Sequence, residues 1–355
     1  MAADTGPRRR KRTARFVEIA QLAGVSTATV DRVLNERGSV SAHARERVVA
    51  AARSLGVPRQ LPDVRHGLIH VDVLLPDTDT PFYRRLQQAL QRAVQMLDRR
   101  VVVHRAILPA ADDTRLAALI ERPAYRRAAL IVTAGDTPRV RDALAGAIAR
   151  GETVVTMVSD IGGIARAHYA GIDNERAGRT AGYCIGRLAK RPGRVLLLGG
   201  RMGYRVHMDR IAGCRAELAR AFPELTCDGT AAETLDQDDL AYGAVAKALR
   251  ASGDVVGIYN SGAGSAGIEA ALRRFGAAGR VVWVGHEMLD QHRAYIEAGT
   301  MDIAIDQDPD GQAISALQHL MHACGVVEQP PPVEPVEFRV FCSANVRTSP
   351  YLQPA

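Results

Sequence analysis

Polar side chains lie on the outer face of a short predicted helix near the start of the chain, where they could read a nucleic acid. Within residues 16–35, two apolar runs at helical spacing flank Gly24. Gly24 permits a sharp turn, and Ser26 can cap the second helix. The outside of that second helix carries Thr27, Ala28, Thr29, Asp31 and Arg32. This is a helix-turn-helix pattern, whose second helix could enter a major groove.

The chemistry of these side chains divides them into two groups. Base edges are within reach of Thr27, Ala28 and Arg32. Arg32 could bind guanine O6 and N7, and Ala28 could contact a thymine methyl group. The phosphate backbone is the better partner for Ser26, Thr29 and Asn35. Asp31 would repel phosphate, so it either reads a cytosine amino group or pairs with a neighbouring arginine.

The net positive charge of the chain comes from the same end. Residues 1–60 hold 12 Lys or Arg and 5 acids, and this excess of 7 equals the net charge of the whole chain. The remaining residues contain 34 basic and 34 acidic side chains and are therefore neutral. The N-terminal segment alone has the electrostatic character of a phosphate-binding surface. The basic run at residues 8–12 is either part of that surface or a solvated tail.

The spacing of Ala, Gly, Ser and Thr in residues 16–35, followed by Val40-Ser41 and a third predicted helix, resembles the LacI family of bacterial repressors. An ordinary helical hairpin within a core is the alternative. The resemblance implies a basic tail at 1–15 and a DNA-binding domain at 16–57. It also implies a homodimer that places one headpiece on each half-site of a double-stranded operator.

Residues 58–67 have the composition of a linker. LacI-like proteins form a short hinge helix at this place, and a leucine of that helix enters the minor groove. Leu61 is the matching residue here, but Pro62 would break a helix directly after it. We therefore expect weak or absent operator bending.

From Leu68 onward, predicted strands and helices alternate, and the alternation restarts after Gly171. Such alternation is typical of parallel sheets with helices on both faces. A stretch of this length exceeds one comfortable core, which favours two lobes. We expect an α/β domain at 68–346, divided near residue 172 and within 286–308, and a tail at 347–355.

This second region resembles the two-lobed periplasmic sugar-binding fold that LacI-like repressors use as an effector domain. The resemblance implies a ligand at the carboxyl ends of strands, between the lobes. It suggests contacts with a sugar or polyol from Phe82, Tyr83, Asn260, Glu287 and Gln307. Two further positions match only after small register shifts, and these are Asp160 and Arg210. The aromatic pair could stack on a sugar ring or could simply fill the lobe.

One motif favours a different class of protein. Residues 262–267 read G-x-G-x-x-G between a predicted strand and a predicted helix, with Glu287 about twenty residues on, as in a dinucleotide-binding enzyme. The motif lies midway along the chain, and no His, Lys or Tyr constellation for hydride transfer accompanies it. A tight turn that brings backbone amides toward the cleft is the competing interpretation.

The rest of the sequence narrows the function further. The five cysteines are scattered, so neither a disulfide framework nor a metal site is expected. We predict no cofactor and no catalytic residues. No apolar run is long enough for a membrane helix, and no signal peptide is apparent, which predicts a cytoplasmic protein. The prediction is a ligand-controlled transcriptional regulator, most simply a repressor, with an enzyme or a transporter's solute-binding protein as alternatives.

Overall fold

A computed structural model describes residues 8–35, 37, 40–57, 68–97, 100–227, 229–251 and 253–351, with the backbone alone for residues 8–15 and 42. The predicted linker at 58–67, including Leu61, lies outside the described residues. The chain divides into two compact units, Met1–Leu68 and Ile69–Ala355. Each unit is described by itself.

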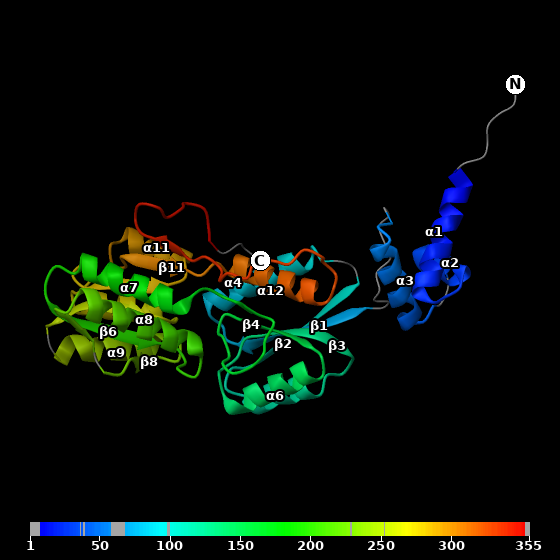
Figure 1. Ribbon diagram of the computed structural model, residues 1–355. Helices are drawn as coiled ribbons and strands as arrows, with labels where there is room; N and C mark the ends of the chain where they lie inside the picture. Colours follow the sequence, from blue (N-terminus) through cyan, green and yellow to red (C-terminus); the bar gives the residue numbers. More distant parts are fainter. Residues whose placement is uncertain are drawn as a thin grey trace, which may run out of the picture. The chain divides into compact units, whose positions relative to one another are not determined.

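The first unit is a bundle of helices around one apolar core (Figure 1). Its described helices are α1 (Arg8–Ala23), α2 (Thr27–Leu34) and α3 (Ala42–Ser54). Gly24 makes the turn with φ of +59°. Ser26 and Ser41 cap the next two helices, accepting hydrogen bonds from the backbone N–H of Thr29 and Ala44. These caps and the turn are the ones that the sequence predicted.

Helix α1 begins earlier than expected. Its backbone is helical from Arg8, inside the segment predicted as a tail. Arg, Lys and Ala lose little side-chain freedom in a helix, so they can extend α1 outward from the residues that pack in the core. The predicted domain boundary at residue 16 therefore falls within a helix.

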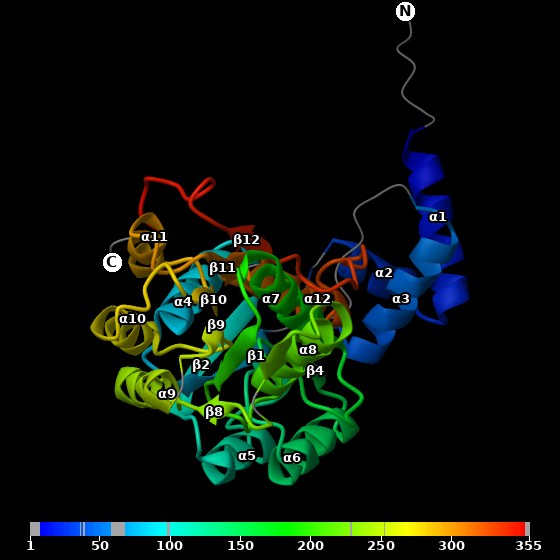
Figure 2. The same ribbon diagram turned by 90° about the vertical axis from the view of Figure 1, so that its left-hand side faces the viewer.

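The first lobe of the second unit is a parallel sheet of order β2-β1-β3-β4-β5. Its strands are β1 (Ile69–Asp77), β2 (Val101–Pro109), β3 (Arg127–Val132), β4 (Thr153–Met157) and β5 (His168–Ala170). Its helices are α4 (Pro81–Val94), α5 (Asp113–Glu121), α6 (Pro138–Ala149) and α12 (Pro309–Ala323). One apolar cluster joins the sheet to α4 and α12, and another joins its opposite face to α5 and α6 (Figure 2).

The second lobe is a larger sheet of order β12-β11-β10-β9-β6-β7, with β8 beside β6. Its strands are β6 (Gly193–Gly199), β7 (Leu225–Cys227), β8 (Ala232–Glu233), β9 (Val255–Asn260), β10 (Val282–His286), β11 (Ile303–Asp306) and β12 (Arg339–Phe341). Its helices are α7 (Asn174–Leu188), α8 (Arg205–Ala221), α9 (Asp238–Ala251), α10 (Ser265–Arg274) and α11 (Asp290–Glu297). Only β12 runs antiparallel to its neighbour in this described sheet.

The chain passes between the lobes three times. It leaves the first lobe between β5 and α7, returns between β11 and α12, and leaves again between α12 and β12. In Figure 1 the orange α12 consequently lies beside the cyan α4, although the two are far apart in sequence. The first two passages lie between Ala170 and Asn174 and between Asp306 and Pro309, where divisions were expected near residue 172 and within 286–308. The third was not expected, because the proline-rich segment before β12 carries no periodic pattern.

Two short strands also escaped the sequence analysis. β5 has three residues and β8 has two, which is too few for an alternating pattern to appear.

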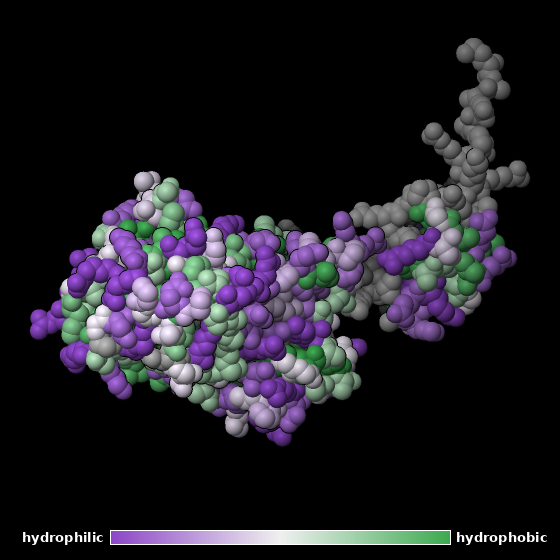
Figure 3. All heavy atoms as spheres, turned by 60° about the vertical axis from the view of Figure 1, so that its left-hand side comes forward, coloured by the Kyte–Doolittle hydropathy of each residue, from purple (hydrophilic) through white to green (hydrophobic). Residues whose placement is uncertain are grey.

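The surface of the second unit in Figure 3 mixes polar and apolar side chains. No described helix is long and apolar enough to cross a membrane. The five cysteines all lie in the described part, and none of them forms a disulfide.

Candidate functional site

A cleft of about 320 Å³ lies between the lobes of the second unit. The residues around it follow the carboxyl ends of strands from both sheets: 78–84 after β1, Val158 after β4, 201–210 after β6, 261–265 after β9 and 286–292 after β10. Parallel strands direct their carboxyl ends to one edge, which is why segments far apart in sequence meet there. Of the predicted effector residues, Phe82, Tyr83, Arg210, Glu287 and Gln307 line this cleft.

The first lobe contributes an aromatic pair. Thr80 caps α4 by accepting from the N–H of Tyr83, which fixes the start of the helix at the cleft. Phe82 and Tyr83 meet edge to face, with ring centroids 5.2 Å apart. No described residue hydrogen-bonds the Tyr83 hydroxyl. Burial, followed by the charges of Tyr204 and Asp236, raises the pKa of Tyr83, so its hydroxyl stays protonated as a donor.

Arg210 connects the cleft to both neighbouring passages between the lobes. Its side chain is buried and donates to Asn174 Oδ1 at 2.8 Å, to the Ser261 carbonyl at 2.9 Å and to Gln307 Oε1 at 2.9 Å. Gly178 allows this placement, because a Cβ atom there would lie 1.9 Å from the Arg210 carbonyl oxygen. The guanidinium is thus held in place before any ligand arrives.

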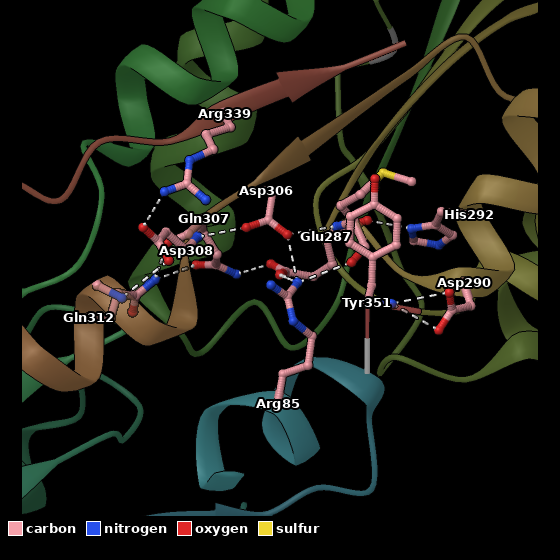
Figure 4. Close-up of polar contacts among 12 residues, drawn as sticks. Arg85, Glu287, Asp290, His292, Asp306, Gln307, Asp308, Gln312, Arg339 and Tyr351 are labelled. Carbon is pink, nitrogen blue, oxygen red and sulfur yellow. Dashed lines mark hydrogen bonds and ion pairs between the residues drawn. The ribbon is translucent and has the colours of Figure 1, made fainter. Parts of the chain in front are cut away.

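Gln307 extends this hydrogen-bond network from Arg210 to Glu287. The Gln307 side-chain amide donates to Glu287 Oε1, and Gln312 donates to the Gln307 carbonyl at 2.8 Å (Figure 4). Glu287 adopts a φ of +73°, a conformation that is rare for a non-glycine residue. Its second oxygen, Oε2, is buried without a hydrogen-bond partner.

A charged group that the sequence analysis missed lies behind Glu287. Arg85 of α4 donates to Asp306 Oδ2 at 2.6 Å and to the Met288 carbonyl at 3.1 Å, and its Nη1 is 3.7 Å from Glu287 Oε2 (Figure 4). Burial, followed by the charge of Asp306, raises the pKa of Glu287 to about 8 despite the arginine. The cluster joins the first lobe to the second.

Histidines supply further polar groups to the second lobe's side of the cleft. His286 shares a hydrogen bond with the Tyr259 hydroxyl at 2.8 Å, whereas its Nδ1 has no partner. His207 is hydrogen-bonded to the Ser261 hydroxyl at 3.1 Å. Burial lowers the pKa of His207 to about 4 and that of His286 well below its ordinary value. Both rings are therefore neutral near pH 7.

Two predicted effector residues lie elsewhere, so these predictions need correction. Asp160 does not line the cleft, because its carboxylate is engaged by the Thr156 hydroxyl and by Arg166. Asn260 is fully buried and does not line it either, because its side-chain amide donates to the carbonyls of Gly262 and Ala263 at 3.0 Å. Asn260 shapes the turn that follows β9.

The G-x-G-x-x-G turn of residues 262–267 holds carboxylates where a dinucleotide site would hold phosphate. The N–H of Ala263 donates to Asp236 Oδ1 at 2.8 Å. The N–H groups of Ala266 and Gly267 both donate to Asp238 Oδ1. Amides already bound to acids cannot cradle a pyrophosphate, and the acids would repel one. The geometry therefore disfavours the dinucleotide interpretation.

Sequence reasoning missed several residues of the cleft, and these are Arg201, Tyr204, His207, Asp236 and Ser261. Apart from the G-x-G-x-x-G turn next to Ser261, their loops show no motif that marks a ligand site, and the pairing of β8 and β9 with β6 brings them together. The part of the chain that the structure describes has no cluster of three or more His, Cys, Asp or Glu placed to hold a metal ion.

The first unit presents its candidate DNA-binding residues on α2. Ser26, Thr27, Ala28 and Arg32 are exposed, and Thr29 and Asn35 are partly buried. Asp31 has a partner that neither sequence alternative included, because the Asn35 side-chain amide donates to its Oδ1 at 2.7 Å. The spacing of four residues places these two side chains on the same face of the helix.

The chain matches two protein families. Residues 71–325 match the periplasmic binding protein domain, and residues 16–57 match the bacterial regulatory proteins of the lacI family. Both resemblances seen in the sequence are thereby confirmed.

Individual proteins agree with these matches. The HTH-type transcriptional regulator MalR of Streptomyces coelicolor is 39% identical over 84 residues, 23% of this chain and 24% of that protein. The ribose operon repressor of Halalkalibacterium halodurans is 38% identical over 79 residues, 21% of this chain and 23% of that protein. These alignments therefore span only about a quarter of the relatives.

A solved structure extends the comparison to the second unit. An ABC transporter solute-binding protein of Burkholderia graminis, in complex with D-arabinose, has a TM-score of 0.73 and 21% identity, covering 81% of this chain and 99% of its own. At this identity the likeness establishes the fold alone. The chain belongs to the periplasmic binding protein domain family and carries a LacI-family helix-turn-helix domain ahead of that domain.

Proposed function

We propose that this protein is a sequence-specific DNA-binding regulator whose operator affinity depends on a small polyhydroxylated effector bound in the cleft. The observation that carries the proposal is the presence, in one chain, of a LacI-family helix-turn-helix and a two-lobed domain with a polar cleft. The first supplies a DNA-reading surface and the second supplies a ligand site. Neither an enzyme nor a transporter's binding protein explains both.

The chemistry of the cleft supports a sugar or polyol as the effector. Phe82 and Tyr83 offer flat apolar faces to the C–H groups of a ring. Arg210, Gln307 and Glu287 offer donors and acceptors in fixed positions, which suits closely spaced hydroxyls. The names of the relatives point the same way, since one is a ribose operon repressor and another is a sucrose operon repressor.

In the proposed mechanism, a homodimer in the cytoplasm places two headpieces on a palindromic operator, and the effector changes their affinity for DNA. A ligand can shift that balance only by its difference in affinity for the two states. The simplest outcome is repression that the effector relieves.

The test is DNA binding by the full chain, measured by fluorescence anisotropy with duplexes from its own promoter region. Arg32→Ala should weaken the preferred duplex about tenfold or more, because a bidentate guanine contact contributes roughly 1–3 kcal/mol of discrimination. Arg274→Ala is the matched control, since Arg274 is exposed on α10 and its loss changes the net charge equally. Binding with no sequence preference, equally reduced by both variants, would contradict the proposal.

A further inference from the structure

The turn after β8 presents an acid, Asp236, to the cleft. Leu235 and Asp236 have φ values of +50° and +64°, which are uncommon for non-glycine residues and are better tolerated by Asp than by Leu. Asp236 Oδ1 accepts from the N–H of Ala263, and no described Lys or Arg lies within ion-pair distance of the carboxylate. The acid therefore keeps hydrogen-bonding capacity for something in the cleft.

Two glycines make room for this carboxylate. A Cβ atom on Gly200 would lie 2.4 Å from Asp236 Oδ1, and one on Gly262 would lie 2.5 Å from the same oxygen. The Cβ on Gly200 would also lie 2.7 Å from His207 Nε2. Asp236 and His207 thus occupy the space that a side chain at residue 200 would fill. This gives Gly262, the first glycine of the G-x-G-x-x-G motif, a role in placing an acid.

Two other side chains of the cleft point independently to a ligand. His286 is 3% exposed and its Nδ1 has no hydrogen-bond partner. Glu287 is 6% exposed, and its Oε2 also has no hydrogen-bond partner, although it lies 3.7 Å from Arg85 Nη1. Both residues line the same cleft as Asp236. Buried polar atoms without partners are rare in folded proteins. A ligand with several hydroxyl groups, which both donate and accept hydrogen bonds, would satisfy them.

The cations of the cleft are mostly committed. Arg84 is paired with Asp79 at 2.6 Å, and Arg210 makes the three hydrogen bonds described above. Arg201 also lines the cleft, and its buried Nε has no partner. Among the described arginines of the cleft, Arg201 is thus the one with the fewest hydrogen bonds and the best placed to attract an anionic ligand, so the test includes it.

We infer that Asp236 is the specificity-determining residue of the cleft, where it accepts a hydrogen bond from a hydroxyl or amine of the effector and excludes phosphorylated ligands. Together with Asp238 it occupies the backbone amides that would otherwise attract a phosphate. The effector is then an unphosphorylated sugar or amino sugar. This inference rests on the proposed function and names its ligand class.

The test is isothermal titration calorimetry of the full chain with D-ribose, D-arabinose, D-allose, D-tagatose and D-glucosamine, and with ribose 5-phosphate and allose 6-phosphate. At least one unphosphorylated probe should bind, and a phosphate ester should bind at least a hundredfold more weakly than its parent sugar. Asp236→Asn should weaken the binding of the sugar at least tenfold. It should also reduce the ratio between the affinity for the sugar and the affinity for its phosphate ester. Asp239→Asn is the matched control, because Asp239 lies three residues later, at an exposed position of α9, and carries the same charge. This variant should change neither the affinity for the sugar nor the ratio of the two affinities.

Several outcomes would overturn the inference. These are an ester that binds as tightly as its sugar and loses affinity in Arg201→Gln, an Asp236→Asn variant with wild-type affinities, and a wild-type chain that binds none of the unphosphorylated probes. Fluorescence of Trp283, the single tryptophan of the chain, verifies that each variant is folded. A failure of the proposed function would appear differently, as the absence of operator-specific DNA binding.

Discussion

Glu287 should contribute a pH dependence to the stability of the second unit near neutrality, and Glu287→Gln should remove that contribution. The carboxyl group is buried beside Asp306, and its Oε2 has no hydrogen-bond partner. These surroundings disfavour the charged form and raise the pKa from 4.5 to about 8. A glutamine has a similar shape, can still accept from Gln307 and carries no charge at any pH.

The sign and size of the effect follow from proton linkage. Between pH 4.5 and about 8 the folded state retains a proton on Glu287 that the unfolded state has lost, so stability falls as the pH rises. Burial lowers the pKa of His168 and His207 from 6.5 to about 4, and that of His286 well below its ordinary value. The unfolded state of these histidines still loses protons up to about pH 7.5, which raises stability over the same range, so the contribution of Glu287 is the difference between the wild type and Glu287→Gln. From about pH 6.5 to about pH 7.5, Glu287 alone should reduce the free energy of unfolding by about 1 kcal/mol.

Urea unfolding measures this directly. Trp283 is fully buried in the second lobe and is the only tryptophan, so its fluorescence reports the unfolding of that lobe. The wild-type chain and Glu287→Gln are compared at about pH 6.5 and about pH 7.5. Over that interval the free energy of unfolding of the wild type should fall by about 1 kcal/mol relative to that of the variant. Equal pH dependence in the two proteins would refute the reasoning about Glu287.

Two further predictions concern helix packing and DNA affinity. Gly178→Ala places a methyl group 1.9 Å from the Arg210 carbonyl oxygen and should cost about 1–3 kcal/mol in urea unfolding. Gly243→Ala, in α9 with open space around it, should instead gain about 0.5–1 kcal/mol. Asp31→Asn removes an acid from α2 and should tighten the binding of a random duplex roughly three- to tenfold at low salt, as anisotropy would show. Unchanged or weaker binding would contradict the last prediction.

The headpiece was predictable because its determinants are local. Gly24 sets a turn through its own backbone freedom, and Ser26 and Ser41 each cap a helix by bonding a residue three positions away. Apolar residues at helical spacing then identify the buried face of each helix. Such features can be recognised within a few residues of sequence.

Much of the effector site was not predictable, because its determinants are distant in sequence. Arg85 lies in a helix whose exposed face looks ordinary, and only the fold brings it to Asp306, 221 residues later. Asp236 follows a strand of two residues, and its carboxylate fits only because Gly200 and Gly262, on other loops, have no side chains. Asp160 does not line the cleft for the opposite reason, which is a local one: Arg166, six residues later, already pairs with its carboxylate.

The polar groups of the cleft are the same groups that hold the passages between the lobes. Arg210 binds Asn174 at the start of α7 and Gln307 before α12, and Gln307 binds Glu287 in turn. A ligand that hydrogen-bonds Glu287 therefore acts on the connection between the lobes without any intermediate element. One hydrogen bond supplied to a buried, unpartnered atom contributes about 1–3 kcal/mol. That is the size of a typical allosteric coupling. Under the proposed function, a ligand that satisfies Oε2 of Glu287 in only one arrangement of the lobes would therefore shift operator affinity by a comparable amount.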